Sequence, residues 1–137
     1  MSDSIQDSVA LSIRQPWAHL IIYAGKDIEN RTWTSRVRGR VLIHASKTMS
    51  RQDYEECAMF CSGLPEGTFP NDFFFPTFDE LQSKLGGIVG VMHIDDCVAK
   101  SDSPWFCGPY GFVIDGAGEL DFQPCKGQLG FFEPKFG

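Results

Sequence analysis

Short apolar runs separated by polar turns occupy the first third of the chain and predict several small elements. Residues 9–13 alternate enough to favour a short strand. In residues 16–24 the apolar positions recur at helical spacing behind a proline suited to a first helical turn, and Gly25 follows as a left-handed cap. We therefore expect a helix at 16–24, an extended segment near the surface at 26–33, and a buried strand at 41–45.

The rest of the chain predicts two more helices, a loop and further strands. Ser50 suits a helix N-cap, and Asp53 makes a weak capping box with it. The expected elements are a helix from Ser50 to about residue 61, an aromatic-rich loop at 64–76, a short helix at 77–85, a strand at 88–98, a hairpin of 112–114 and 120–122 around a turn at 115–118, and a last strand at 127–132.

Five to six short strands with two to three helices predict an α+β domain built on a small β-barrel or a strongly bent sheet. The 137 residues fit one domain, which we place at 9–134 after a flexible N-terminus at 1–8. No apolar run reaches the length of a membrane span, and the acidic start does not resemble a signal peptide. We expect a monomer in the cytoplasm, without membrane contact.

The charge is distributed unevenly along the chain, whose formal net charge is -6. Between Arg14 and Arg51 there are eight basic and two acidic residues, giving +6, while the remainder has four basic and sixteen acidic residues, giving -12. A cationic segment within an anionic protein favours a local anion site and makes long non-specific DNA a poor partner. The alternative is that these cations pair with the acidic half.

Metal and cofactor motifs are weak. The five cysteines are an odd number at irregular spacing, which favours reduced thiols over a disulfide framework or a zinc site. His93 and Cys97 lie four apart, a pattern more typical of a buried histidine than of a ligand pair. The sequence shows no phosphate-binding loop, serine nucleophile elbow or metalloprotease histidine pair. We expect no metal and no cofactor.

Residues 25–33 hold the most informative polar pattern. In an extended segment Glu29, Arg31 and Trp33 share one face, while Lys26, Ile28, Asn30 and Thr32 share the other. A carboxylate, a guanidinium and an indole on one face suit a planar heterocycle. The alternative is a Glu29–Arg31 ion pair that braces the barrel. Trp105 could close the pocket as an aromatic lid or lie in the core.

Several motifs together resemble the ASCH domain family of the PUA-like superfamily. They are LSIRQPWA at 11–18, GKDIENRTW at 25–33, RGRVLIHA at 38–45, FPND at 69–72, and the segments 87–97 and 101–104. The resemblance implies a β-barrel with flanking helices and a cleft between the first helix and the barrel that takes nucleic acid or a nucleoside. Some members of the family resemble nucleic-acid binders, one branch hydrolyses acylated cytidines, and ribonuclease activity has been proposed for others. The hydrolase branch has a lysine that matches Lys26, but the threonine expected three residues later is Glu29 here.

The leading hypothesis is a module that binds RNA, another single-stranded nucleic acid or a modified nucleoside. The residues expected to hold a base are Gln15, Trp17, Lys26, Glu29, Asn30, Arg31, Trp33 and Trp105, and those expected along the phosphates are Arg36, Arg38, Arg40 and Lys47. The rival hypothesis is a small hydrolase of modified nucleosides or RNA, in which Lys26 is the nucleophile or base and Glu29 moves the proton. A third hypothesis is a protein-interaction adaptor that uses the aromatic residues at 69–75.

Overall fold

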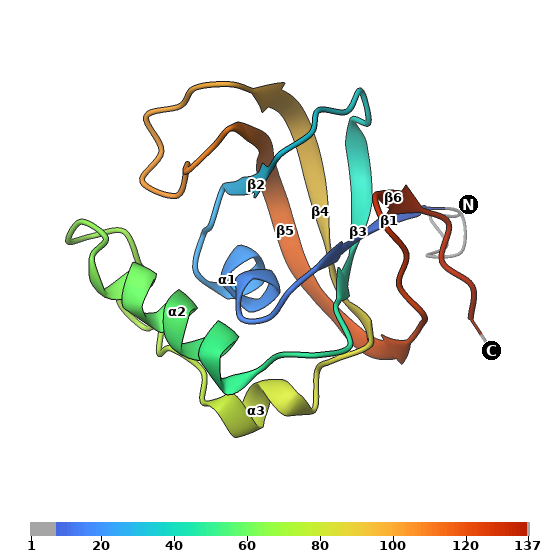
Figure 1. Cartoon of the computed structure of the whole chain (residues 1–137), viewed down its shortest axis with the longest axis horizontal. Helices are drawn as coiled ribbons and strands as arrows, with labels where there is room; N and C mark the ends of the chain where they lie inside the picture. The colour runs from blue at the N-terminus through green and yellow to red at the C-terminus, as the bar shows by residue number, and fades with distance from the viewer. Residues whose placement is uncertain (1–7, 137) are drawn as a thin grey trace.

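A single curled sheet of six strands forms the body of the molecule (Figure 1). The computed structural model describes residues 8–136, so most of the N-terminus expected to be flexible lies outside the described residues. The strand order is β2-β5-β4-β3-β1-β6. The elements are β1 Val9–Ile13, α1 Trp17–Tyr23, β2 Ile28–Arg31, β3 Gly39–Ala45, α2 Arg51–Ser62, α3 Phe78–Gln82, β4 Gly87–Val98, β5 Tyr110–Pro124 and β6 Phe131–Phe132. The half-barrel confirms the expected α+β class.

Strands β1 and β3 are the parallel pair of the sheet, and the other neighbouring strands pair antiparallel. Helix α1 follows β1 and lies inside the curve of the sheet (Figure 1), where Ala18, Leu20 and Ile21 are buried. Gly25 ends this segment with φ of 75°, as the sequence predicts. Because β1 and β3 are parallel, their carboxyl ends lie at the same end of the sheet, close to the start of α1.

The two opposite edges of the sheet approach each other where it curls. Arg31 at the end of β2 donates from Nη2 to the carbonyl oxygen of Ser12 in β1, over 2.9 Å. Trp33, just beyond β2, packs edge-to-face on Phe131 of β6 with ring centroids 5.8 Å apart, and on Phe112 of β5 at 5.5 Å. These contacts hold the edge strand β2 close to β1 and β6.

Helices α2 and α3 both begin with complete capping boxes and lie to one side of the sheet (Figure 1). In α2 the Ser50 hydroxyl accepts from the backbone of Asp53, and the Asp53 carboxylate accepts from the backbone of Ser50, which confirms the predicted start. Helix α3 is shorter than the predicted 77–85. The chain turns after Ser83 because the Gly86 amide bonds back to the carbonyl of Ala45 and leads into β4.

Two predictions for the last third of the chain are wrong. The hairpin expected around residues 115–118 is one continuous strand, β5, which pairs with the whole length of β4. Register shifts in this pairing accommodate the glycine-rich segment, and Gly116 has φ of 59°, so the segment bulges instead of reversing. The strand expected at 127–132 is confined to β6, and residues 125–130 form a loop.

The core consists of three hydrophobic clusters, of which the largest fills the space between α1 and the sheet. A second cluster contains Trp105 and the cysteines of α2, and the partly buried Phe69, Phe73 and Phe75 pack against it. Phe74 is the exposed member of this aromatic run, with 86% of its surface accessible. Within the described residues, no helix is long and apolar enough to span a membrane.

Candidate functional site

A pocket of about 1110 Å³ lies at the carboxyl ends of the parallel strands β1 and β3. The start of α1, strand β2 and the loop 125–130 complete its wall. The lining residues are Ser12, Arg14, Trp17, Lys26, Glu29, Asn30, Arg31, His44, Ser46, Lys47, Phe60, Gly86, Cys107, Cys125, Lys126, Gly127, Gln128, Leu129 and Gly130. This volume exceeds that of a typical small-molecule pocket, so it has room for a nucleotide.

Glu29 lies between two cations in the wall of this pocket. Lys26 Nζ donates to Glu29 Oε1 over 3.0 Å and also to the carbonyl oxygen of Ile28. Arg31 donates to Glu29 Oε2 from Nε over 3.2 Å and from Nη2 over 3.0 Å. The side chains of Lys26 and Glu29 are only 2% and 10% exposed, whereas that of Arg31 is 20% exposed. The three groups form a charged cluster of net charge +1.

The electrostatics of this cluster keep Glu29 ionised. Burial raises the pKa of the Glu29 carboxyl, but the charges of Lys26 and Arg31 and their hydrogen bonds outweigh burial and hold the pKa below its usual value. The ion pair between Glu29 and Arg31, one of the two alternatives from the sequence, is present. It lines the pocket, and the bond from Arg31 to the Ser12 carbonyl also holds β2 against β1. Lys26 was expected on the opposite face from Glu29. However, Lys26 precedes β2, so the alternation of side chains along the strand does not apply to it, and its Nζ reaches the Glu29 carboxylate.

A second polar cluster, which the sequence analysis missed, lies at the ends of β1 and β3. His44 is 1% exposed, and its Nδ1 lies 2.9 Å from Ser12 Oγ. Its Nε2 lies 2.6 Å from the carbonyl oxygen of Cys125, and Ser46 Oγ lies 3.1 Å from Ser12 Oγ. Burial lowers the pKa of His44 by more than the Cys125 hydrogen bond raises it, so the ring is neutral near neutral pH.

The rim of the pocket is cationic and partly aromatic. Arg14, Lys47 and Lys126 line it and are exposed. Arg14 has a distant ion pair with Asp53, at 3.4 Å, whereas Lys47 and Lys126 form no ion pair within the part of the chain that the structure describes. Trp17 packs edge-to-face on Phe60 with centroids 5.5 Å apart, and both line the pocket. The site therefore combines exposed positive charge with an aromatic wall.

The structure places several of the expected ligand-binding residues outside the pocket. Gln15 is 2% exposed and bonds through its side chain to the backbone of His19 and Lys84, which fixes the start of α1. Trp33 and Trp105 are not among the lining residues. Trp105 is 2% exposed in the second core cluster, so the expected aromatic lid is instead a packed core residue.

Asn30 lines the pocket, but its side chain holds the loop that follows Trp105. Its Nδ2 donates to the carbonyl of Trp105 over 3.0 Å, and its Oδ1 accepts from the amides of Cys107 and Gly108. Both polar atoms of this amide therefore bond to the loop, and the residue positions β2 relative to it.

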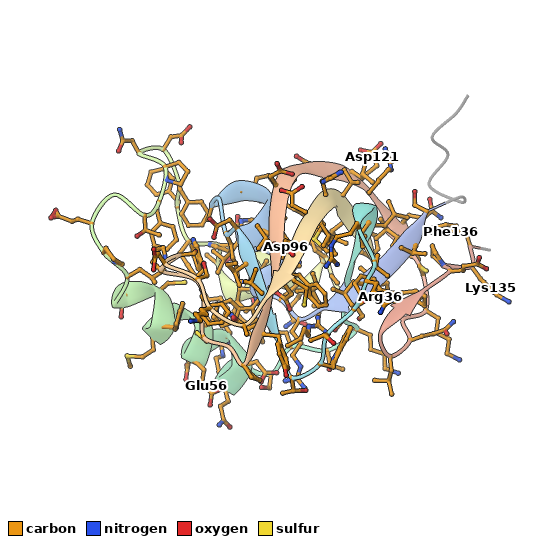
Figure 2. All side chains as sticks on the ribbon, turned by 90° about the horizontal axis from the view of Figure 1, so that it is seen from above. Arg36, Glu56, Asp96, Asp121, Lys135 and Phe136 are labelled. Atoms are coloured by element: carbon orange, nitrogen blue, oxygen red, sulfur yellow. The ribbon has the colours of Figure 1, made fainter. Side chains whose placement is uncertain are left out.

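Arg36 and Arg38 of the β2–β3 connection and Arg40 of β3 lie away from the pocket lining. Arg36, labelled in Figure 2, is exposed on this connection. Arg38 bonds to the carbonyl oxygens of Ser35 and Val37 and lies 3.7 Å from an Asp96 oxygen. Arg40 is exposed within β3. Of the four residues expected along the phosphates, Lys47 is the one that lines the pocket.

A separate group of exposed side chains brings His93, Asp95 and Asp115 together, with ligand atoms within 4.8 Å of one another. His93 Nδ1 lies 2.7 Å from Asp95 Oδ1 and 3.6 Å from Asp115 Oδ1. These three residues lie outside the pocket lining. Because His93 contacts the two carboxylates in this way, its ring has polar partners on β4 and β5.

The curled sheet with an internal helix and a cation-rich pocket defines an α+β domain of the PUA-like type. The sequence profile of the ASCH domain matches residues 11–107, more than half of the chain, and the protein belongs to the ASCH domain family. It is similar to activating signal cointegrator 1 from Homo sapiens, with 32% identity over 93 residues, and to the same protein from Mus musculus, with 31% identity over 93 residues. Each match covers 66% of this chain but only 14% of the relative.

Proposed function

We propose that this ASCH domain binds single-stranded nucleic acid, with one base in the pocket and the neighbouring phosphates at its rim. The observation that carries the proposal is the charge of the pocket. Five cationic side chains line it, those of Arg14, Lys26, Arg31, Lys47 and Lys126, and Glu29 is the one carboxylate among the lining residues. In a chain of net charge -6, this concentration of positive charge favours an anionic ligand. Family membership supports nucleic-acid binding at the level of the family.

The interior and wall of the pocket suit a base. Trp17, Phe60 and Leu129 supply an apolar surface, and Leu129 is 99% exposed at the pocket edge. Stacking on such surfaces stabilises single strands without strong sequence preference. Glu29 and the hydroxyls of Ser12 and Ser46 lie in the same pocket and accept hydrogen bonds from polar groups of the base.

Phosphates would contact Arg14, Lys47 and Lys126 first, because these exposed cations lie at the pocket itself. Arg36, Arg38 and Arg40 follow β2 along the chain and lie outside the lining. In this proposal they contact a strand only when it is long enough to continue past Arg31. A mononucleotide would therefore be insensitive to them, and a longer oligonucleotide would not.

Fluorescence anisotropy with labelled single strands of RNA and DNA at two salt concentrations tests this proposal. We expect Lys47→Ala and Lys126→Ala to weaken binding and each to reduce the slope of log affinity against log salt by about 0.7 for one lost phosphate contact. Lys100→Ala is the matched control, because this exposed lysine lies outside the pocket lining, and it should change neither quantity. No binding to any oligonucleotide, or binding unaffected by both pocket variants, would rule the proposal out.

The contact of Lys26 with Glu29 favours hydrolysis of a modified nucleoside or RNA as the second candidate function. In that mechanism Lys26 is the nucleophile or base and Glu29 moves the proton to the leaving group. A lysine must be neutral to act in this way. Lys26 Nζ lies within hydrogen-bond distance of Glu29, the group that would move the proton, and also of the Ile28 carbonyl. Chromatography after incubation with acylated cytidine or RNA distinguishes the two functions: turnover that disappears in Lys26→Ala would establish the hydrolase.

A further inference from the structure

Ser46, Ser12, His44 and the backbone of Cys125 form a continuous chain of polar atoms along one wall of the pocket. The successive distances are 3.1 Å between the two serine oxygens, 2.9 Å from Ser12 Oγ to His44 Nδ1, and 2.6 Å from His44 Nε2 to the Cys125 carbonyl oxygen. Ser12, Ser46 and His44 all line the pocket. None of these contacts is needed for the charge complementarity described above.

The carbonyl at the end of this chain fixes the direction of every hydrogen bond in it. A carbonyl oxygen can only accept, so His44 Nε2 carries the proton and donates to Cys125. In the neutral ring Nδ1 is then an acceptor, and the Ser12 hydroxyl donates to it. Ser12 has a single proton, so Ser46 must donate to Ser12 in the contact between the two hydroxyls. Both hydroxyl protons are therefore directed along the chain.

This polarity leaves only lone pairs on the Ser12 and Ser46 oxygens for a ligand. We propose that this hydrogen-bond relay selects nucleobases that present an exocyclic amino group, cytosine and adenine, over their keto counterparts uracil and hypoxanthine. The inference rests on the proposed function and specifies which base the pocket favours. An amino group donates to the Ser46 oxygen while Ser46 keeps its bond to Ser12, whereas a keto oxygen at the same place either stays without a hydrogen bond or draws the Ser46 proton away from Ser12.

The relay is held rigidly enough to discriminate. His44 is 1% exposed, and Phe132 packs edge-to-face on its ring with centroids 5.6 Å apart. The backbone of Gly127 lies close to the same ring, and a Cβ at this position would be only 2.7 Å from His44 Cε1. Reversing the bond between Ser12 and His44 would require His44 to lose its bond to Cys125 or to take up a second proton in a buried place. Turning the Ser46 proton toward a keto oxygen would instead break the Ser46–Ser12 hydrogen bond. The cost of leaving a polar group unpaired translates into about tenfold or greater discrimination.

Calorimetry with CMP, UMP, AMP and IMP tests the inference, since each pair differs mainly in the amino and keto groups. We expect CMP to bind about tenfold or more tightly than UMP, and AMP more tightly than IMP. Ser46→Ala should remove the preference within each pair, and Ser46→Thr, which keeps the hydroxyl, should retain it. Lys47→Ala is the matched control, which should weaken all four nucleotides by the same factor and leave the preference intact.

Equal affinity within both pairs for the wild-type chain, or a preference that survives in Ser46→Ala, would overturn the inference while leaving the proposed function standing. If Ser46→Ala fails to fold, as judged by circular dichroism, Ser12→Ala provides the same comparison because it removes the hydroxyl that Ser46 must donate to. If none of the mononucleotides binds, oligocytidine and oligouridine of equal length replace them: binding without preference overturns the inference alone, and no binding overturns the proposed function as well.

Discussion

Glu29 takes part both in the contacts that hold the sheet together and in the wall of the pocket. Its two oxygens accept from Lys26 and Arg31, and Arg31 in turn bonds to the Ser12 carbonyl. The sequence alone left a pocket residue and a barrel brace as alternatives. The structure places Glu29 in both positions, because the pocket opens where the two edges of the sheet approach each other.

Glu29→Gln is therefore expected to cost stability as well as ligand affinity. The variant leaves the buried Lys26 ammonium without its carboxylate partner, and loss of one partner of a buried pair typically costs ~3–5 kcal/mol. The double variant Lys26→Met with Glu29→Gln should recover part of this loss, since it removes the unpaired buried charge as well. Urea unfolding of the three proteins checks the order of their midpoints. Equal midpoints for the wild type and Glu29→Gln would contradict the role as a brace.

The pH dependence of stability provides an independent check on the same residue. The folded-state pKa of Glu29 lies below the usual value of 4.5, so the unfolded state binds more protons as the solution is acidified. The stabilisation by Glu29 is thus complete above pH 4.5 and is lost as the pH falls through the lower folded-state pKa. The wild type should therefore lose more stability between neutral pH and strong acid than the double variant does.

At the scale of elements, local signals predicted the beginnings of helices and the strands of the first half, and long-range pairing decided the rest. Ser50 with Asp53, and Gly25, are local motifs whose geometry depends on a few neighbouring residues, and both predictions are confirmed. The segment 115–118 has the composition of a turn, yet it lies within β5 because β4 offers a continuous partner along its whole length. No local pattern contains that information.

The pocket shows the same division. Residues 25–33 indicated Lys26, Glu29 and Arg31 because charged side chains cluster there, and all three line the pocket. Ser12 of β1 and Ser46, just after β3, were missed because the parallel pairing of β1 with β3 brings them together. The loop 125–130 was missed because its place depends on long-range contacts such as the bond from the Cys125 amide to the Gly86 carbonyl. Trp33 and Trp105 were predicted as ligand contacts because their rings can stack on a base. In the structure, Trp33 packs on Phe131 where the sheet curls, and Trp105 is buried in the second core cluster.

The loop 125–130 owes its position to Gly127, which gives an element-scale prediction. A Cβ at this position would lie 2.7 Å from His44 Cε1 and 3.2 Å from Ser12 Oγ, so Gly127→Ala must displace the loop or the histidine. We expect a loss of ~1–3 kcal/mol in stability together with loss of the preference for amino bases, although no hydroxyl is removed. In Gly118→Ala the new Cβ meets nothing within 4 Å, so this control should retain both properties. Thermal unfolding and nucleotide calorimetry measure the two effects; an unchanged preference in Gly127→Ala would show that the relay does not depend on the loop.

Across the whole molecule, the separation of charge sets the conditions under which a ligand can bind. The pocket concentrates positive charge, while the chain as a whole carries -6. A short anionic ligand experiences the field of the pocket, whereas a long duplex would also experience repulsion from the acidic remainder. If the proposed function holds, we therefore expect a nucleotide or short single strand to bind better than extended DNA.

Under the proposed function, we expect the stabilisation that a bound ligand gives to the folded state to depend on the ligand's phosphate. A ligand at 100 times its dissociation constant stabilises the folded state by about 2.7 kcal/mol, which corresponds to several degrees in the unfolding temperature of a domain of this size. At one fixed concentration, CMP should raise the unfolding temperature more than cytidine, because only CMP carries the charge that Arg14, Lys47 and Lys126 attract. Added salt should reduce the CMP shift and leave the cytidine shift nearly unchanged, since salt screens exposed charges and not contacts with the base. Thermal unfolding with both ligands at two salt concentrations measures this difference. Equal shifts at both salt concentrations would mean that the rim cations do not contact the phosphate, and the ligand would then be held by its base alone.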